Sequence, residues 1–344
     1  MAQTAVKQRL NYIDDAKALA ILLMIIGHSA TYKPVDVLIY GFHIPLFFIV
    51  SGLFFNPNRS LSENISKGIK QLIVPYFCFE IINLLICWIS PYLHPELYNG
   101  ISGWGILKAA LLGILIAQDR VTSVSFLPYG PLWFLVALFW VKVMMSVMGK
   151  LFKNRYLLFC VSSALGIVMY FMLSKEFIHI KTFGVSIFSF KSACMGLPFY
   201  AVGYLLKGFD FSKIKFRPLI TLLLLTIYVI SAFYNGICGI DERNYGRYMV
   251  LFYLNAVIGT IAVILFFSQV KMPEYVHDVG RNTLLILGLS GFPILAYKVI
   301  EMYVFGQSLI SHFYVYVPLS ILSIVVIMPL RGFFNKYLPF VLGK

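Results

Sequence analysis

An amine and an imidazole lie eleven residues apart near the start of the chain, at Lys17 and His28, with apolar residues between them. Eleven residues make about three turns of an α-helix, so a helix would place both side chains on one face, about 16 Å apart along its axis. The two groups cannot contact each other, but they could hold two ends of one long ligand. Ionisable side chains inside lipid-spanning helices are costly, and by default they mark a pathway or a reactive site.

A second polar group follows closely in an apolar setting. The segment Phe42–Gly52 contains His43, then Pro45, and Ser51 near its end. A proline inside a helix removes a hydrogen bond and distorts the backbone. His43 could therefore line a reactive site or bond to the backbone at the distortion, and the sequence supports the two readings equally.

Composition places these residues in a membrane protein. Of the 344 residues, 60% are apolar and only 12% are charged, and the mean hydropathy is +0.85. Apolar runs of about twenty residues recur along the chain, and this length crosses a bilayer as a helix. Closed β-barrels show short alternating segments instead, so the sequence predicts an all-α, polytopic membrane helical bundle.

About ten transmembrane helices are expected, in a single integral-membrane domain over residues 1–344 with no appended soluble domain. The stretch 101–118 is apolar but short and glycine-rich, which favours an interfacial or re-entrant segment. The first span is expected to remain uncleaved, because no clear small-residue cleavage site follows it. The expected spans are 16–32, 36–55, 71–92, 131–149, 156–174, 190–206, 218–236, 248–268, 283–302 and 310–330.

The basic residues predict the orientation of this bundle. With the N-terminus inside, 19 of the 28 basic residues fall on cytoplasmic segments or span ends, so both termini are expected in the cytoplasm. The net charge of +14 is dispersed over short loops, whereas a nucleic-acid footprint would gather it on one soluble surface. The 19 residues are Lys7, Arg9, Lys17, Arg59, Lys67, Lys70, Lys142, Lys150, Lys153, Arg155, Lys207, Lys213, Lys215, Arg217, Lys271, Arg281, Arg331, Lys336 and Lys344.

The cysteines lie in or beside apolar segments, without the spacing of a zinc site or of a disulfide framework. Buried free thiols are their expected state, and no metal is expected. They are Cys78, Cys87, Cys160, Cys194 and Cys238.

The motifs described above resemble those of the acyltransferase-3 family, bacterial integral-membrane O-acyltransferases that decorate surface glycans. The stretch Asn11–His28 fits the family's basic-x10-His motif in the first helix, and Phe42–Gly52 fits its second-helix signature. Lys67–Tyr76 is similar to the basic-x-x-basic entry to the third helix. The closest resemblance is to the branch of fucose and enterobacterial-polysaccharide acetylases. Weaker matches follow in the family's order at Gly130–Leu135, Leu197–Leu206 and Val279–Leu284.

The resemblance implies an O-acetyltransferase of the bacterial inner membrane. It would move an acetyl group from acetyl-CoA to a sugar hydroxyl of a cell-surface or lipid-linked glycan. His28 would be the general base, since the pKa of histidine is best matched to removing a hydroxyl proton. Lys17, Lys67 and Lys70 would anchor the phosphates of CoA at the cytoplasmic surface, and an extended pantetheine arm would reach toward His28.

Two features depart from the family pattern. The ninth-span motif usually ends in a histidine, and this chain has Ser290 there, which removes a second imidazole. The third-helix pair is Lys67 and Lys70 rather than two arginines, which keeps the positive charge but loses the bidentate fork.

Further residues are expected to line the substrate site together with His43 and Ser51. Glu80, with Asn83 one turn away, is expected to be a buried carboxylate. It either takes part in the functional site or forms a structural ion pair with a neighbouring helix. Trp133 either stacks on a sugar or belongs to the aromatic belt of the membrane interface.

Two lysines also have simpler readings. Lys17 could extend toward the membrane surface and pair with Asp14 one turn back. Lys142, near a cytoplasmic span end, is expected to snorkel in the same way.

A glycan or small-solute transporter or flippase is the alternative function, because it too would place polar groups at mid-membrane. Transporters often contain inverted repeats with broken helices in matching positions, and the sequence shows no such repeat. A glycan polymerase is a third option, but polymerases tend to have a large outer loop, whereas the loop 93–130 is modest and apolar.

Overall fold

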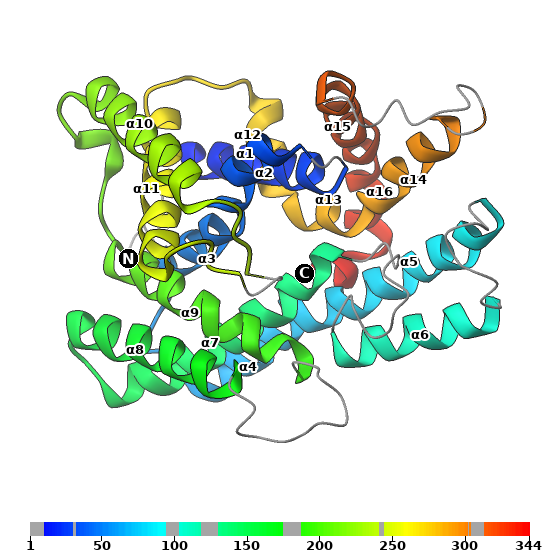
Figure 1. Cartoon of the computed structure of the whole chain (residues 1–344). Helices are drawn as coiled ribbons and strands as arrows, with labels where there is room; N and C mark the ends of the chain where they lie inside the picture. The colour runs from blue at the N-terminus through cyan, green and yellow to red at the C-terminus, as the bar shows by residue number, and fades with distance from the viewer. Residues whose placement is uncertain are drawn as a thin grey trace, which may run out of the picture.

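The chain folds into a bundle of α-helices (Figure 1). This computed structural model describes residues 10–29, 32–93, 103–117, 130–174, 187–240, 244–301, 303 and 313–344. In these ranges the sole β-type contact is an isolated bridge between Gly239 and Asn244, so the expected all-α class is confirmed. The helices are α1 (Asn11–Ser29), α2 (Lys33–Tyr40), α3 (His43–Leu53), α4 (Leu61–Gly68), α5 (Val74–Leu93), α6 (Gly103–Ile116), α7 (Trp133–Leu151), α8 (Arg155–Ser174), α9 (Phe190–Leu205), α10 (Arg217–Asn235), α11 (Met249–Phe267), α12 (Glu274–Arg281), α13 (Thr283–Leu289), α14 (Gly291–Ile300), α15 (Phe313–Ile327) and α16 (Arg331–Tyr337).

Seven helical segments of the described residues are long and apolar enough to cross a membrane, and they correspond to seven of the expected spans. The other expected spans fall on α1, on α9 and on α13 with α14. Helix α1 carries charged residues in its first two turns, α9 has 16 residues, and α13 and α14 are separated at Ser290. The count of about ten therefore stays a prediction. The seven segments are Lys33–Leu53, Leu61–Ile86, Trp133–Leu151, Arg155–Met172, Arg217–Asn235, Met249–Phe267 and Val315–Tyr337.

The outer helices show the surface expected of a protein in lipid. On α10, Leu219, Leu222 and Ile230 are 64 to 67% exposed. Exposing this apolar surface to water would be unfavourable, whereas the hydrocarbon core of a bilayer would cover it. The protein is a multi-pass membrane protein by this composition and these helix lengths.

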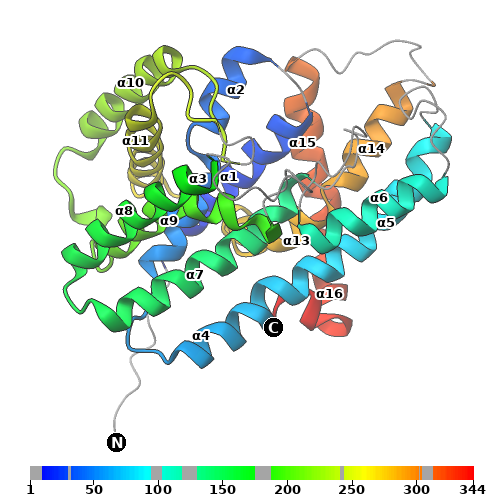
Figure 2. The same cartoon turned by 60° about the horizontal axis from the view of Figure 1, so that its bottom comes forward.

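Helix α4 continues into α5 as one rod through a π-helical turn, Ile69–Ile73 (Figure 2). A capping box begins the rod: the Ser60 hydroxyl accepts from the Glu63 amide at 3.1 Å, and the Glu63 carboxylate accepts from the Ser60 amide at 3.0 Å. At 1.5 Å per residue the rod is roughly 50 Å long, longer than the hydrocarbon core of about 30 Å. Its α4 end therefore has length to reach beyond one membrane surface.

Helix α6 is an apolar helix that packs beside α5 (Figure 1). The Tyr76 hydroxyl of α5 donates to the Ile114 carbonyl of α6 at 2.8 Å. With 14 residues, α6 is short for a membrane crossing, and its interfacial or re-entrant position stays a prediction.

Helix α1 lies in the middle of the bundle, because its opposite faces belong to two different hydrophobic clusters. Ile21 and Ile25 pack in the larger cluster, and Ala16 and Ala20 pack in the smaller one. The position of α1 is therefore fixed from both sides.

Glycines allow a close helix crossing between α3 and α9. A Cβ at Gly203 would lie 1.9 Å from the Ile49 carbonyl oxygen, and one at Gly52 would lie 2.1 Å from the Tyr200 carbonyl oxygen. Neither position has room for a side chain. Small residues at such crossings let two helix backbones approach closely in membranes.

Several segments that the charge distribution assigns to one side of the membrane are in contact. Helix α12 packs on α1, and its backbone at Gly280 touches the Asp14 carbonyl, where a Cβ would lie 1.8 Å away. Three hydrogen bonds also join such segments: Lys207 Nζ to the Phe55 carbonyl at 2.6 Å, Arg217 Nη1 to the Ser268 carbonyl at 2.8 Å, and Arg281 Nη2 to Asn11 Oδ1 at 3.2 Å.

Candidate functional site

Helix α1 is continuous from Asn11 to Ser29, so Lys17 and His28 lie on one uninterrupted helix as expected. At 1.5 Å per residue they are about 16 Å apart along its axis. Their surroundings differ. Lys17 lies in a network of charges, and His28 lies close to a break between α2 and α3.

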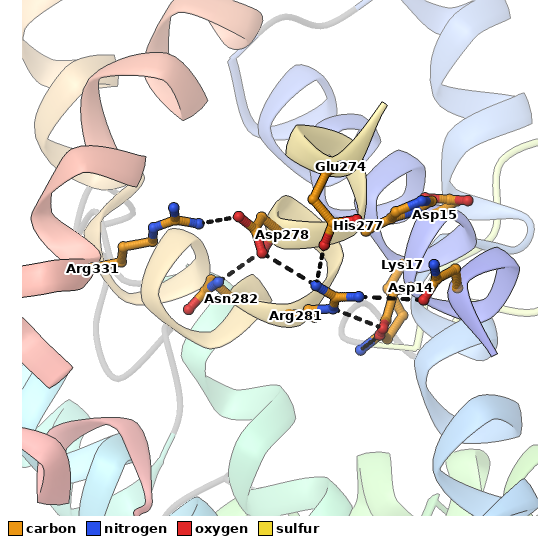
Figure 3. A network of polar contacts seen from close by, with 10 residues as sticks. Asp14, Asp15, Lys17, Glu274, His277, Asp278, Arg281, Asn282 and Arg331 are labelled. Carbon is orange, nitrogen blue, oxygen red and sulfur yellow. Dashed lines mark hydrogen bonds and ion pairs between the residues drawn. The ribbon is translucent and has the colours of Figure 1, made fainter. Parts of the chain in front are cut away.

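Figure 3 shows the charge network around Lys17, whose amine is 2.7 Å from Asp14 Oδ1. Arg281 of α12 approaches the other oxygen of Asp14, with Nε 3.5 Å from Oδ2. Arg281 also pairs with Glu274 at 2.5 Å. The structure thus contains the ion pair of Lys17 with Asp14, the simpler of the two roles expected for Lys17.

Asp278 extends this network to α16. It lies 3.4 Å from Arg281 Nη1 and forms an ion pair with Arg331. The hydrogen bond from Arg331, together with the positive charges of both arginines, keeps the pKa of the Asp278 carboxyl below its ordinary value. Charges thus hold α12 against both α1 and α16.

A second, buried pair lies next to this network on α1 and α12. His277 Nδ1 lies 2.5 Å from Asp15 Oδ1, and the two residues are only 8% and 1% exposed. The sequence reasoning missed this pair because 262 positions separate its members. The only local signal was a second acidic residue beside Asp14, at the start of an apolar helix.

Tyr40 links the His28 end of α1 to His43. Its hydroxyl donates to the Gly27 carbonyl at 2.8 Å, next to His28. Its ring meets the His43 ring edge-on, with centroids 5.3 Å apart. The structure therefore brings together the two imidazoles expected in the site, through a tyrosine that the sequence did not single out.

The break between α2 and α3 falls at Gly41 and Phe42, within the single span expected over 36–55. A break in a membrane helix frees backbone groups that must find partners inside the protein. Here the Tyr228 hydroxyl donates to the Leu38 carbonyl at 2.5 Å. His43 Nδ1 bonds to the Ile39 carbonyl at 2.8 Å.

This last bond fixes the chemistry of His43. A carbonyl oxygen only accepts, so Nδ1 carries the proton and Nε2 offers a lone pair. His43 is fully buried, and Nε2 has no hydrogen-bond partner within the part of the chain that the structure describes. Bonding at the break and lining of a site are therefore compatible roles for this one side chain.

Lys67 and Lys70 lie on the rod and line an open groove of about 640 Å³. Neither lysine is ion-paired with a carboxylate of the described residues, although Glu63 lines the same groove. Within those residues no hydrogen bond or ion pair joins Lys17 to either lysine, so contacts do not bring the three expected anchors together. The groove is completed by Ser62, Glu63, Ser66, Gln71, Gly343 and Lys344.

The other expected lining residues lie on different helices. Glu80 and Asn83 are buried on α5, with 3% and 4% exposure. Trp133 begins α7, is 6% exposed and packs edge-on against Phe134 in the larger core cluster. Ser51 is half-buried on α3, next to the α3–α9 crossing.

Ser290, expected from the resemblance to replace a histidine, lies at the C-cap of α13. Its hydroxyl donates to the Leu287 carbonyl at 3.2 Å. The side chain therefore satisfies a backbone group at the helix end, a common use of serine.

The cysteines are free thiols where the structure describes them: Cys78, Cys160, Cys194 and Cys238. Cys194 and Cys238 are buried as expected, whereas Cys160 is exposed on the outer face of α8. No group of three or more His, Cys, Asp or Glu side chains in the described ranges could hold a metal ion.

Comparison with known proteins gives one match. A family model described as an acyltransferase domain matches residues 10–331. No curated protein and no solved structure matches the chain significantly. The matched region includes the whole of α1 with its charge network, the break beside His43 and the groove lysines on the rod. The chain therefore belongs to the acyltransferase-3 family and is a multi-pass membrane acyltransferase.

Proposed function

We propose that the protein transfers an acetyl group from acetyl-CoA to a sugar hydroxyl of a cell-surface or lipid-linked glycan. The observation that carries this proposal is Tyr40, which contacts both the His28 end of α1 and the ring of His43 at a helix break, within an acyltransferase domain. Breaks in membrane helices commonly form binding sites, because irregular backbone at membrane depth is tolerated only where protein or a water-filled cavity surrounds it.

His28 acts as the general base in this proposal. It removes the proton of the sugar hydroxyl while the oxygen attacks the thioester carbonyl carbon. The C–S bond then breaks, and the imidazolium returns its proton to the CoA thiolate. His43 lines the site, and its Nε2 accepts a hydrogen bond from the sugar, because Nδ1 is already bound to the Ile39 carbonyl.

The lysines bind the donor at the opposite end. Lys67 and Lys70 offer two ammonium groups in an open groove, which suits the phosphates of the CoA head. Lys17 adds a third ammonium on α1, with Asp14 holding it in place. The length of α1 between Lys17 and His28, about 16 Å, suits an extended pantetheine arm. Glu80, Ser51 and Trp133 complete the proposed lining.

We place the enzyme in the bacterial inner membrane, with both termini and the donor groove on the cytoplasmic side. The acceptor glycan then lies on the far side, and the acyl group crosses within the bundle. The match of residues 10–331 to an acyltransferase domain supports a transferase and gives no support to a transporter.

Release of CoA tests the proposal. Purified protein incubated with acetyl-CoA and a panel of glycans should release CoA thiol with at least one of them, and the His28→Ala variant should not. A transporter or flippase would release none. Wild-type protein that binds acetyl-CoA but releases no CoA with any glycan of the panel would contradict the proposed activity.

A further inference from the structure

A group of cations lies where α4 packs against α7, and of its members only Lys67 has been assigned to the donor site above. A Cβ at Gly68 of α4 would lie 2.9 Å from the Phe139 ring of α7, so these residues face each other. Ten residues along α7, Gly149 faces Pro57 in the loop before α4. Lys142, one turn after Phe139, therefore lies on the face of α7 that α4 and this loop cover.

The surroundings of Lys142 do not suit a snorkelling side chain. Helix α7 ends at Leu151, about 13 Å further along its axis, and Lys142 is half-buried. Among the described residues, the charged groups that act on its ammonium are Lys67 and Arg59, both positive. Lys142 forms no ion pair with any carboxylate among the described residues.

Three cations close together repel one another, and the repulsion grows as burial lowers the effective dielectric constant. A partly buried cation is normally paired, because desolvation is costly otherwise. Glu63 is the carboxylate whose field reaches Arg59, and its oxygen already accepts from the Ser60 amide. Within the described residues none of the three cations forms an ion pair, so the site is positively charged and an anion would stabilise it.

We propose that Arg59, Lys67 and Lys142 form a binding site for a phosphate ester, and that this ester is the phosphate-bearing head of the acyl donor. The inference rests on the proposed function and deepens it. Lys67 also lines the open groove with Lys70, so the cluster continues that groove toward the inside of the bundle. Arg59 supplies the planar fork that the two groove lysines lack.

The same chemistry would suit the headgroup of an anionic lipid, and the experiment separates the two sources. Acetyl-CoA affinity is measured by calorimetry on the full chain in detergent free of anionic lipid. Lys142→Met and Arg59→Gln should each weaken binding roughly tenfold or more, the effect of losing one charge-assisted hydrogen bond. Lys142→Arg should retain most of the affinity. Lys150→Met is the matched control, an exposed lysine two turns further along α7 that should bind acetyl-CoA like the wild type.

Thermal stability in nanodiscs with and without phosphatidylglycerol is the second arm. Stabilisation by phosphatidylglycerol that is lost in Lys142→Met, with acetyl-CoA affinity unchanged, would assign the site to a lipid and overturn the donor assignment. If the variants bind acetyl-CoA with wild-type affinity and are stabilised by phosphatidylglycerol as the wild type is, the proposed binding site is wrong. Arg59→Gln lies in a loop and carries the test if Lys142→Met does not fold. Wild-type protein that binds acetyl-CoA through this cluster but releases no CoA with any glycan would refute the proposed activity and leave the binding site standing.

Discussion

His28 and Lys17 share one helix, but their partners differ, and this difference separates their expected effects. The His28 end of α1 is joined through Tyr40 to His43 at the helix break, and we expect His28 to act on the reacting atoms. His28→Ala should lower kcat by about 10²–10⁴-fold, the usual loss for a general base, and leave acetyl-CoA affinity largely intact. Steady-state kinetics and calorimetry on the same preparation measure both quantities. Near-normal turnover in His28→Ala would remove the catalytic assignment.

Lys17 should affect binding rather than turnover. It lies about 16 Å from His28 along α1, so the two cannot share one bond-making step. Lys17→Ala should raise the KM for acetyl-CoA with little change in kcat, as expected when uniform binding is lost. Its ion pair with Asp14 suggests the competing outcome. A lower melting temperature with unchanged KM would show that Lys17 only supports the network around Asp14.

At the scale of residues, sequence reasoning succeeded where one helix carries the pattern. The spacing of Lys17 and His28 needs only the period of an α-helix, and α1 is continuous over both. It failed where partners are remote. Tyr40 and the Asp15–His277 pair depend on helices that meet only in the folded bundle, so no local period reveals them.

At the scale of elements, α12 is held by charges, and its attachment should depend on pH. Asp278 has its pKa lowered by the hydrogen bond from Arg331. The folded state then binds fewer protons at this group than the unfolded state, so its contribution to stability is complete above the unfolded value of about 3.9 and is lost as the pH falls through the lowered folded value. The melting temperature of the wild type should therefore fall more steeply below about pH 4 than that of Asp278→Asn.

Arg331→Gln is the matched variant for this prediction. It removes the main cause of the lowered pKa and leaves the carboxylate in place, so its pH dependence should approach that of Asp278→Asn. If the melting temperatures of the wild type and both variants vary with pH in the same way between about pH 3 and 7, the α12–α16 contact does not stabilise the fold.

The α3–α9 crossing should tolerate no added side chain. Gly203→Ala places a Cβ within 1.9 Å of the Ile49 carbonyl oxygen, which only backbone movement can relieve. We expect a loss of about 1–3 kcal/mol of stability, as for an overpacked core. Gly332→Ala is the control, because nothing lies within 4 Å of its added Cβ, and alanine favours a helix over glycine. Equal melting temperatures for the two variants would contradict the close crossing.

Span positions were predictable, whereas breaks within spans were not. Apolar runs of sufficient length gave the positions of α7, α10 and α11 to within a few residues. The expected span over 36–55 is found as Lys33–Leu53, but a break between α2 and α3 interrupts it. Tyr228, 190 positions away from Leu38, satisfies the carbonyl that the break leaves free. The expected span over 283–302 is also two helices, separated at Ser290. Such breaks depend on hydrogen-bond partners from other helices, and the apolar pattern of one segment does not predict these partners.

At the scale of the whole molecule, contacts link segments that the charge distribution assigns to one side. Arg217 bonds to Ser268, so the start of α10 and the end of α11 lie together. Arg281 joins α12 to Asn11 at the start of α1. The chain between α10 and α11, residues 236–248, connects the other ends of these two helices. Because α10 and α11 are each long enough to cross a membrane, this loop should lie on the opposite side from Arg217 and Ser268.

Cysteine labelling tests this arrangement and its orientation together. In a variant whose five cysteines are replaced by alanine, single cysteines are placed at Lys213, just before α10, and at Arg247, just before α11. Both positions are exposed, so accessibility depends on the membrane and not on burial. An impermeant maleimide added to intact cells should label Arg247→Cys and miss Lys213→Cys, and permeabilised cells should show labelling of both. The excess of basic residues near Lys213 sets this expected direction. The reverse pattern would invert the orientation and move the groove of Lys67 and Lys70 to the outer face, where cytoplasmic acetyl-CoA could not reach it.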